Sequence, residues 1–163
     1  MNWIAISGIA ETVGAFGVII SLIYVGLQIR QNTIASRAAN YQQWVDTQVN
    51  VNRALSDDPA ITELIDRANH DFASLSTAEL LRLQMVFYNH FTQWNVAFTN
   101  DKYSLLDKEK WQLVEHGYEL FIPHTPALRH MWGYCGSVYD EGFRTHVETV
   151  IARAQNNLTS TKP

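Results

Sequence analysis

The sequence is poor in cysteine, proline and charged residues, and each shortage excludes a class of protein. Its single cysteine, Cys135, excludes an internal disulfide framework and a multi-cysteine metal cluster. Four prolines and eight glycines in 163 residues exclude a disordered or collagen-like chain. Only 17% of the residues are charged, against about 25% in an average soluble domain. Apolar residues must therefore be concentrated in one part of the chain.

Clustered positive charge is also missing. The formal net charge is −4, and no long run of Lys and Arg occurs. Because nucleic-acid binding depends on such clusters, we expect no nucleic acid as a partner. The chain length suits one domain and leaves little room for a second.

The apolar excess lies near the start of the chain. Residues 12–29 carry no charge, and extending this segment back to Trp3 adds one acid, Glu11. A hydrocarbon core of about 30 Å is crossed by about 20 apolar residues, so residues 1–29 are predicted to form a transmembrane helix. A buried helix of a soluble domain rarely runs this long without a charge, which makes it the weaker alternative.

The charges on either side of this segment predict its orientation. Only Glu11 precedes it, whereas Arg30, Arg37 and Arg53 follow it against a single acid, Asp46. By the positive-inside rule the N-terminus lies outside the cytoplasmic (inner) membrane, and the rest of the chain lies in the cytoplasm. A cleavable signal peptide would need a basic start, and no basic residue precedes Arg30.

Small residues form one face of the predicted transmembrane helix. They recur at spacings of three and four, which aligns them along one stripe: Ser7, Ala10, Gly14, Gly17 and Ser21. Lipid tails gain nothing from such a groove, whereas another helix can approach closely there. The stripe predicts a helix-packing face; the alternative is the ordinary composition of membrane helices.

Polar residues mark both ends of the span. Trp3 and Arg30 are predicted to anchor it at the outer and inner interfaces. With Trp3 at the outer interface, Glu11 lies about 12 Å deeper, where a carboxylate needs a polar partner or a proton. With residues 12–29 as the span, Glu11 lies among the headgroups instead.

The junction that follows the span is also polar. The amides of Gln28, Gln31 and Asn32 are expected at headgroup depth, where they can bond lipid phosphates or a neighbouring protein. The alternative is an interfacial segment that simply has to be polar.

Local signals predict where the later helices begin. No turn residue separates the span from residues 30–55, so the same helix is expected to continue as a stalk. It should stop before Asp58, a good N-cap, and Pro59, a good first helical residue. Ser76 and Glu79 have the spacing of a capping box, which opens another helix.

The complete pattern predicts an all-α fold. The segments are a transmembrane helix 1–29, a stalk helix 30–55, a bundle of about five helices in a cytoplasmic domain 56–155, and a frayed tail 156–163. Helices are expected over residues 60–69, 77–98, 108–121, 126–134 and from about 141 onward. The helix over 77–98 carries the strongest apolar stripe, with Phe91 and Trp94 at its centre.

The sequence contains no recognised catalytic or metal-binding motif. The six histidines are His70, His90, His116, His124, His130 and His146. None occurs in a Glu-x-x-His pair or a His-Glu-x-x-His motif, so we expect surface or hydrogen-bonded histidines and no metal site. Cys135 lies in a predicted small-residue turn without an activating neighbour, so we expect a packed or incidental cysteine and no nucleophile. We predict no catalytic residue and no cofactor. An apolar pocket that binds a lipid or pigment remains as an alternative.

The junction also carries a resemblance. Residues 21–33 (SLIYVGLQIRQNT), Asp58-Pro59, Leu105-Leu106-Asp107 and Phe143-Arg144 resemble a widespread family of bacterial single-span membrane proteins with a helical cytoplasmic domain. The resemblance covers most of the chain, and it implies no known activity and no catalytic residue.

These patterns favour a non-enzymatic function. We expect an accessory or scaffolding subunit of an inner-membrane assembly, in contact with membrane lipids and docked on another membrane protein through the small-residue face. The alternatives are a module that associates with itself through the same face and, with less support, a binder of a lipid or small ligand.

Overall fold

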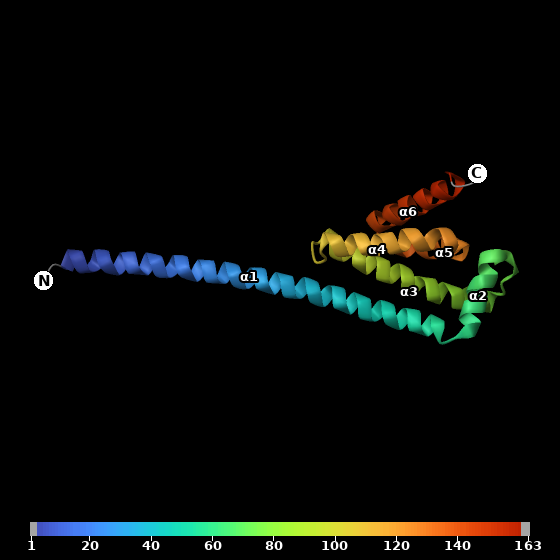
Figure 1. Ribbon diagram of the computed structural model, residues 1–163, viewed down its shortest axis with the longest axis horizontal. Helices are drawn as coiled ribbons and strands as arrows, with labels where there is room; N and C mark the ends of the chain where they lie inside the picture. Colours follow the sequence, from blue (N-terminus) through green and yellow to red (C-terminus); the bar gives the residue numbers. More distant parts are fainter. Residues whose placement is uncertain (1–2, 161–163) are drawn as a thin grey trace. The chain divides into compact units, whose positions relative to one another are not determined.

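The computed structural model describes the backbone of residues 3–160 and the side chains of residues 11, 13–53 and 55–156. In this part of the chain the fold is all-α, as predicted, with six α-helices, three single turns of 3-10 helix and no strand (Figure 1). The chain forms two compact units, Met1–Ala39 and Asn40–Pro163.

A single helix, α1 (Trp3–Ser56), makes up the described part of the first unit and continues into the second. By length and composition it is long and apolar enough to cross a membrane. Every described side chain between Val13 and Ser36 is exposed to solvent. Helix formation there comes from local backbone hydrogen bonds, and no burial within the chain adds to it.

The second unit starts inside α1, whereas the sequence places the start of the domain at residue 56. The reason is Trp44, whose Nε1 donates a hydrogen bond to the Gln93 carbonyl at 3.0 Å and whose ring packs against the core. The last turns of α1 therefore belong to the helical domain.

Local capping chemistry starts α2 (Pro59–His70), as predicted. The Asp58 side chain accepts a hydrogen bond from the Ala60 amide at 3.0 Å, and Pro59 occupies the first turn. Leu64 and Ala68, four residues apart, are the buried residues of this helix. The short turn η1 (Phe72–Ser74) then leads to α3.

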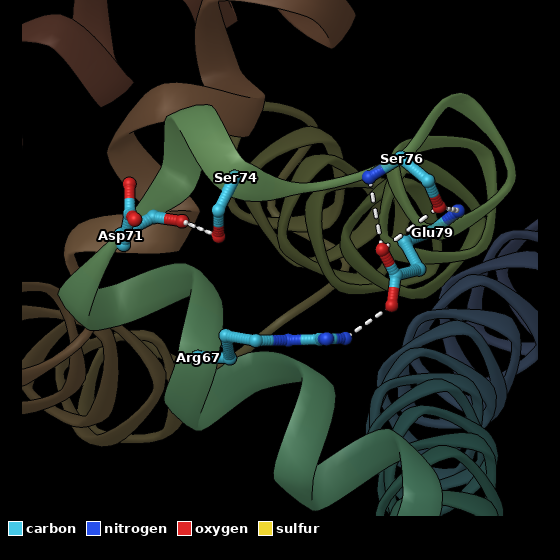
Figure 2. A network of polar contacts seen from close by, with 5 residues as sticks. All are labelled: Arg67, Asp71, Ser74, Ser76 and Glu79. Atoms are coloured by element: carbon cyan, nitrogen blue, oxygen red, sulfur yellow. Dashed lines mark hydrogen bonds and ion pairs between the residues drawn. The ribbon is translucent and has the colours of Figure 1, made fainter.

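The predicted capping box is present at the start of α3 (Thr77–Lys102). The Ser76 amide donates to Glu79 Oε2 at 2.9 Å, and the Glu79 amide donates to Ser76 Oγ at 3.4 Å (Figure 2). Glu79 also forms an ion pair with Arg67, which links α2 to the first turn of α3. In the connecting turn Ser74 Oγ donates to the Asp71 carbonyl at 2.8 Å. These contacts hold the turn between the two helices.

Helix α3 forms the centre of the core. Phe91 and Trp94 are fully buried, which confirms the stripe read from the sequence. The Trp94 ring stacks on Tyr118 with 4.3 Å between centroids and 9° between planes. The helix extends to Lys102, beyond the predicted end, and the chain then turns at Ser104, whose φ of 56° is in the left-handed region.

Three further helices complete the unit: α4 (Lys108–Phe121), α5 (Pro126–Cys135) and α6 (Glu141–Ser160), joined by η2 (Ile122–His124) and η3 (Gly136–Val138). Helix α4 has the predicted bounds. The predicted frayed tail is wrong for residues 156–160, because α6 continues to Ser160. Buried residues at helical spacing, Val147, Val150 and Ala154, hold this helix against the core and allow it to propagate.

Candidate functional sites: an exposed helix face and a groove

The predicted packing face on α1 is open at its described positions. A Cβ atom added at Gly14 or Gly17 would have no neighbour within 4 Å. Ser21 Oγ donates to the Gly17 carbonyl at 2.8 Å, so its hydroxyl is satisfied within the helix. The side chains of Ser7 and Ala10 lie outside the described residues. The described part of the stripe is thus a smooth surface on which another helix can pack closely.

Large apolar side chains cover the rest of this segment and are exposed. They are Val13, Phe16, Val18, Ile19, Ile20, Leu22, Ile23, Tyr24, Val25, Leu27, Ile29 and Ile34. Monomeric soluble proteins rarely expose contiguous apolar patches larger than a few hundred Å². An apolar surface this continuous needs a covering of lipid, of protein or of both.

The predicted polar residues of α1 are also at its surface. Glu11, Arg30, Gln31 and Asn32 are exposed. Gln28 is exposed too, and its Nε2 donates to the hydroxyl of Tyr24 at 2.9 Å. The side chain of Trp3, the predicted outer anchor, lies outside the described residues. The described side chains of this group are therefore accessible to a lipid headgroup or to a neighbouring protein.

A groove that the sequence did not reveal lies within the second unit, between the last turns of α1, α3 and α4. Its volume is about 310 Å³, near the lower limit for ligand pockets. The lining residues are Trp44, Gln48, Asn52, His90, Leu113, Val114, Gly117, Tyr118 and Phe121. The walls are mainly apolar, and these lining residues include no Asp, Glu, Lys or Arg.

Two polar side chains of this groove have atoms without a partner. The Oε1 of Gln48 and the Nε2 of His90 are buried and form no hydrogen bond. His90 is only 6% exposed and stacks on Phe121, and burial lowers the pKa of its imidazole below the ordinary 6.5. The expectation of a surface or hydrogen-bonded histidine is therefore wrong at Nε2 of this residue. Buried polar atoms without partners are uncommon, and each calls for an explanation.

The helical spacing in the sequence already indicates that His90 and Gln48 face the domain. His90 follows Phe87 by three residues and precedes Trp94 by four, which places it on the buried face of α3. Gln48 follows Trp44 by four, on the face of α1 that contacts the domain. What the sequence could not show is that the packing of α1, α3 and α4 forms a groove lined by both residues.

The remaining polar clusters have structural roles. Arg67 pairs with Glu79 and Arg82 pairs with Asp58, so both guanidinium groups have partners. The carboxylate of Glu79 accepts hydrogen bonds from Ser76 and Arg67, which lowers its pKa. The first pair joins the last turn of α2 to the first turn of α3, and the second joins the N-cap of α2 to α3, so the charges of both pairs are already compensated.

His146 and Glu115 form a second, half-buried pair. The His146 Nε2 lies 3.8 Å from Glu115 Oε1, which is too far for a hydrogen bond. Burial lowers the pKa of His146 and raises the pKa of Glu115, so burial disfavours the charged form of each. Trp111 and Phe98 pack around the imidazole with centroid distances of 5.5 and 5.1 Å. The residues that the structure describes contain no group of three or more possible metal ligands.

Cys135 is not in the predicted turn. It is the last residue of α5 and is buried, and burial raises the pKa of its thiol. A buried thiol with a raised pKa is a poor nucleophile, since the thiolate is the reactive form.

We compared the chain with protein families, curated proteins and solved structures. No family model, no curated protein and no solved structure matches the chain.

Proposed function

We propose that this protein is a non-enzymatic accessory subunit of an inner-membrane assembly. The first half of α1 crosses the membrane with its N-terminus outside, and the helical domain lies in the cytoplasm. The face that contains Gly14, Gly17 and Ser21 docks on a membrane helix of a partner protein. The resemblance of the junction to bacterial single-span proteins is consistent with this placement.

The observation that carries the proposal is the exposure of α1. Its side chains from Val13 to Ser36 are exposed without exception, and large apolar groups dominate them. A bilayer removes this surface from water, which is favourable by about 25 cal/mol for each Å² of apolar area. The open positions at Gly14 and Gly17 then allow close approach of a helix.

Filling the docking face tests the proposal. The double variant Gly14→Ile/Gly17→Ile keeps the span apolar, and a Cβ at either position meets nothing within 4 Å. We expect it to insert in the membrane with a folded helical domain but to lose its partner. Extraction in mild detergent, followed by size analysis and mass spectrometry of the co-purified proteins, provides the measurement.

The matched control is Ala15→Ile/Gly26→Ile. By the 100° rotation per residue of an α-helix, Ala15 and Gly26 point about 130° and about 150° away from the mean direction of Gly14 and Gly17. A Cβ at Gly26 also meets nothing within 4 Å. The control should keep the partner; equal loss in both variants would contradict the docking face.

The composition of the extracted complex separates the alternatives. A stoichiometric foreign subunit supports the proposal, whereas a homo-oligomer favours self-association through the same face. A wild-type protein that is extracted as a monomer contradicts both.

The orientation has its own test. The excess of Arg30, Arg37 and Arg53 after the apolar segment predicts a cytoplasmic C-terminus. A reporter that works only in the cytoplasm should be active when fused to the C-terminus. Activity of a periplasmic reporter at the same position would overturn the orientation.

A further inference from the structure

We propose that the segment that joins α3 to α4, residues 102–110, rests on the anionic headgroups of the membrane that α1 crosses. This contact needs the apolar segment of α1 in the bilayer, so it rests on the proposed function. It gives the helical domain a second attachment to the membrane, separate from the docking face on α1. Three properties of the second unit support it: the end at which the segment lies, the side chains that it exposes, and the distribution of charge.

The segment lies at the end of the unit where α1 enters it. Helices α1 and α3 run in opposite directions, because Trp44 bonds the carbonyl of Gln93, whereas Leu55, eleven residues later, lines a groove with Arg82, eleven residues earlier. The last turn of α3 and the first turn of α4 are therefore at the same end as the first residues of α1 in the unit.

The length of α1 permits contact with the headgroups. The Nζ of Lys110 lies 5.0 Å from the ring centroid of Tyr41 on α1. Tyr41 follows Ile29, the last residue of the apolar segment, by twelve residues of continuous helix, which corresponds to about 18 Å. Headgroups fill about 5–8 Å of this distance. A helix tilt of about 20°, which is the average for membrane helices, brings one side of the domain closer still.

The tip of the segment exposes an aromatic and an apolar side chain. Ser104 has a φ of 56°, and on either side of it Tyr103 is 64% and Leu105 is 41% exposed. The turn is well formed, because Leu106 is buried and the Leu105 amide donates to the Asn100 carbonyl at 2.7 Å. Tyrosine, with an apolar ring and a polar hydroxyl, is enriched at membrane–water interfaces.

Positive charge surrounds this tip. Three of the four lysines in the chain lie in these nine residues: Lys102, Lys108 and Lys110. None of them forms an ion pair with another residue that the structure describes. Asp107 and Glu109 offset part of this charge and leave the segment positive. The cytoplasmic leaflet is negative and attracts such lysines, each of which contributes about 5-fold to binding near the surface.

Negative charge is concentrated at the opposite end of the unit. Residues 57–79, from the start of α2 to the first turn of α3, contain six acidic residues against one arginine, Arg67. Helix α2 and the segment 102–110 lie at opposite ends of the unit (Figure 1). An anionic surface therefore attracts one end of the domain and repels the other, which favours a single orientation.

Relaxation of ¹⁹F nuclei by gadolinium on the lipid headgroups tests the contact. The full chain is labelled with 3-fluorotyrosine and placed in nanodiscs of phosphatidylcholine and phosphatidylglycerol. Tyr24 reports on insertion of α1 and Tyr103 on the segment 102–110. Tyr134, whose ring lies 6.4 Å from Phe72 beyond the end of α2, reports on the far end of the domain.

We expect strong relaxation at Tyr24 and Tyr103 and weak relaxation at Tyr134. In nanodiscs of phosphatidylcholine alone, relaxation at Tyr103 should fall while that at Tyr24 stays, because the lysines lose their anionic partner.

A pair of double variants connects the contact to the lysines. Lys102→Gln/Lys108→Gln should lower the ratio of bound to free segment, measured at Tyr103, by about 25-fold. The matched control is Arg144→Gln/Arg153→Gln, which removes the same charge from exposed positions on α6. It should change the ratio by less than about 2-fold, since salt screens charges beyond about 8 Å.

The three tyrosines separate this contact from the proposed function. Strong relaxation at Tyr24, with Tyr103 relaxed no more than Tyr134, would leave the span intact and refute the contact. Absence of relaxation at Tyr24 would refute the span and the contact together. Equal relaxation of Tyr103 in both lipid mixtures, or an equal loss in the two double variants, would also overturn the proposal.

Discussion

Replacement of Phe91 by alanine measures how much the core of the helical domain depends on its aromatic centre. Phe91 is fully buried on α3, and its ring meets the edge of Trp132 with 4.9 Å between centroids and 63° between planes. Truncation of a buried phenylalanine costs about 3–5 kcal/mol, and the value rises with the cavity that remains.

For Phe91→Ala the structure indicates a loss of stability in the upper part of this range. Trp132 would have to move to fill the space, yet it also packs on Tyr139 at 5.8 Å and on Phe143 at 6.0 Å. Because these contacts hold the indole in place, the site collapses poorly. The lost edge-to-face pair adds to the cost of the cavity. We therefore expect Phe91→Ala to lower the free energy of unfolding by about 4–5 kcal/mol.

The assay is urea unfolding of the full chain in detergent, followed by tryptophan fluorescence. The control is Leu81→Ala on the same helix, where the side chain is 55% exposed and the change should stay within about 0.5 kcal/mol. Should Phe91→Ala cost less than about 1 kcal/mol, the stripe on α3 would not be the core of the domain, and the packing described above would be refuted.

Three further predictions concern glycines and pH. Gly117→Ala should stabilise the domain by about 0.5–1 kcal/mol in the same urea assay, because alanine favours a helix and its Cβ has open space. Gly136→Ala should destabilise it, since the new Cβ would lie 3.0 Å from the ring of the tightly packed Trp132. Burial lowers the pKa of His90 and of His146, so the unfolded chain takes up protons more readily. Stability should fall as the pH drops below about 6.5 and through the lowered values. In His90→Gln this slope should be smaller, and an unchanged pH dependence would contradict the role given to its burial.

The features that the sequence predicted are those set by neighbouring residues. Asp58 caps the helix that Pro59 begins, and Ser76 and Glu79 form their box, because each partner lies within a few residues of the other. The apolar stripe on α3 is local in the same sense, since one helix face repeats every three or four residues. Such signals need no knowledge of the fold.

Features that depend on distant contacts were not predicted. Trp44 joins α1 to the domain through the carbonyl of Gln93, 49 residues away, and no local pattern shows this bond. The groove beside His90 is lined by side chains from α1, α3 and α4, which only the packing of the helices brings together. The spacing of His90 puts it on a buried face, yet only the fold shows that its Nε2 lacks a partner.

Glycines of the described residues differ in what an added Cβ atom would meet. At Gly136 an added Cβ would lie 3.0 Å from the Trp132 ring, so the packing inside the domain favours a residue without a side chain. At Gly14 and Gly17 a side chain would meet nothing, so the fold of the chain gives no reason for their small size. Glycine in the interior of a helix is destabilising by roughly 0.5–1 kcal/mol relative to alanine. Under the proposed function, the close approach of another helix accounts for two such residues on one face of α1.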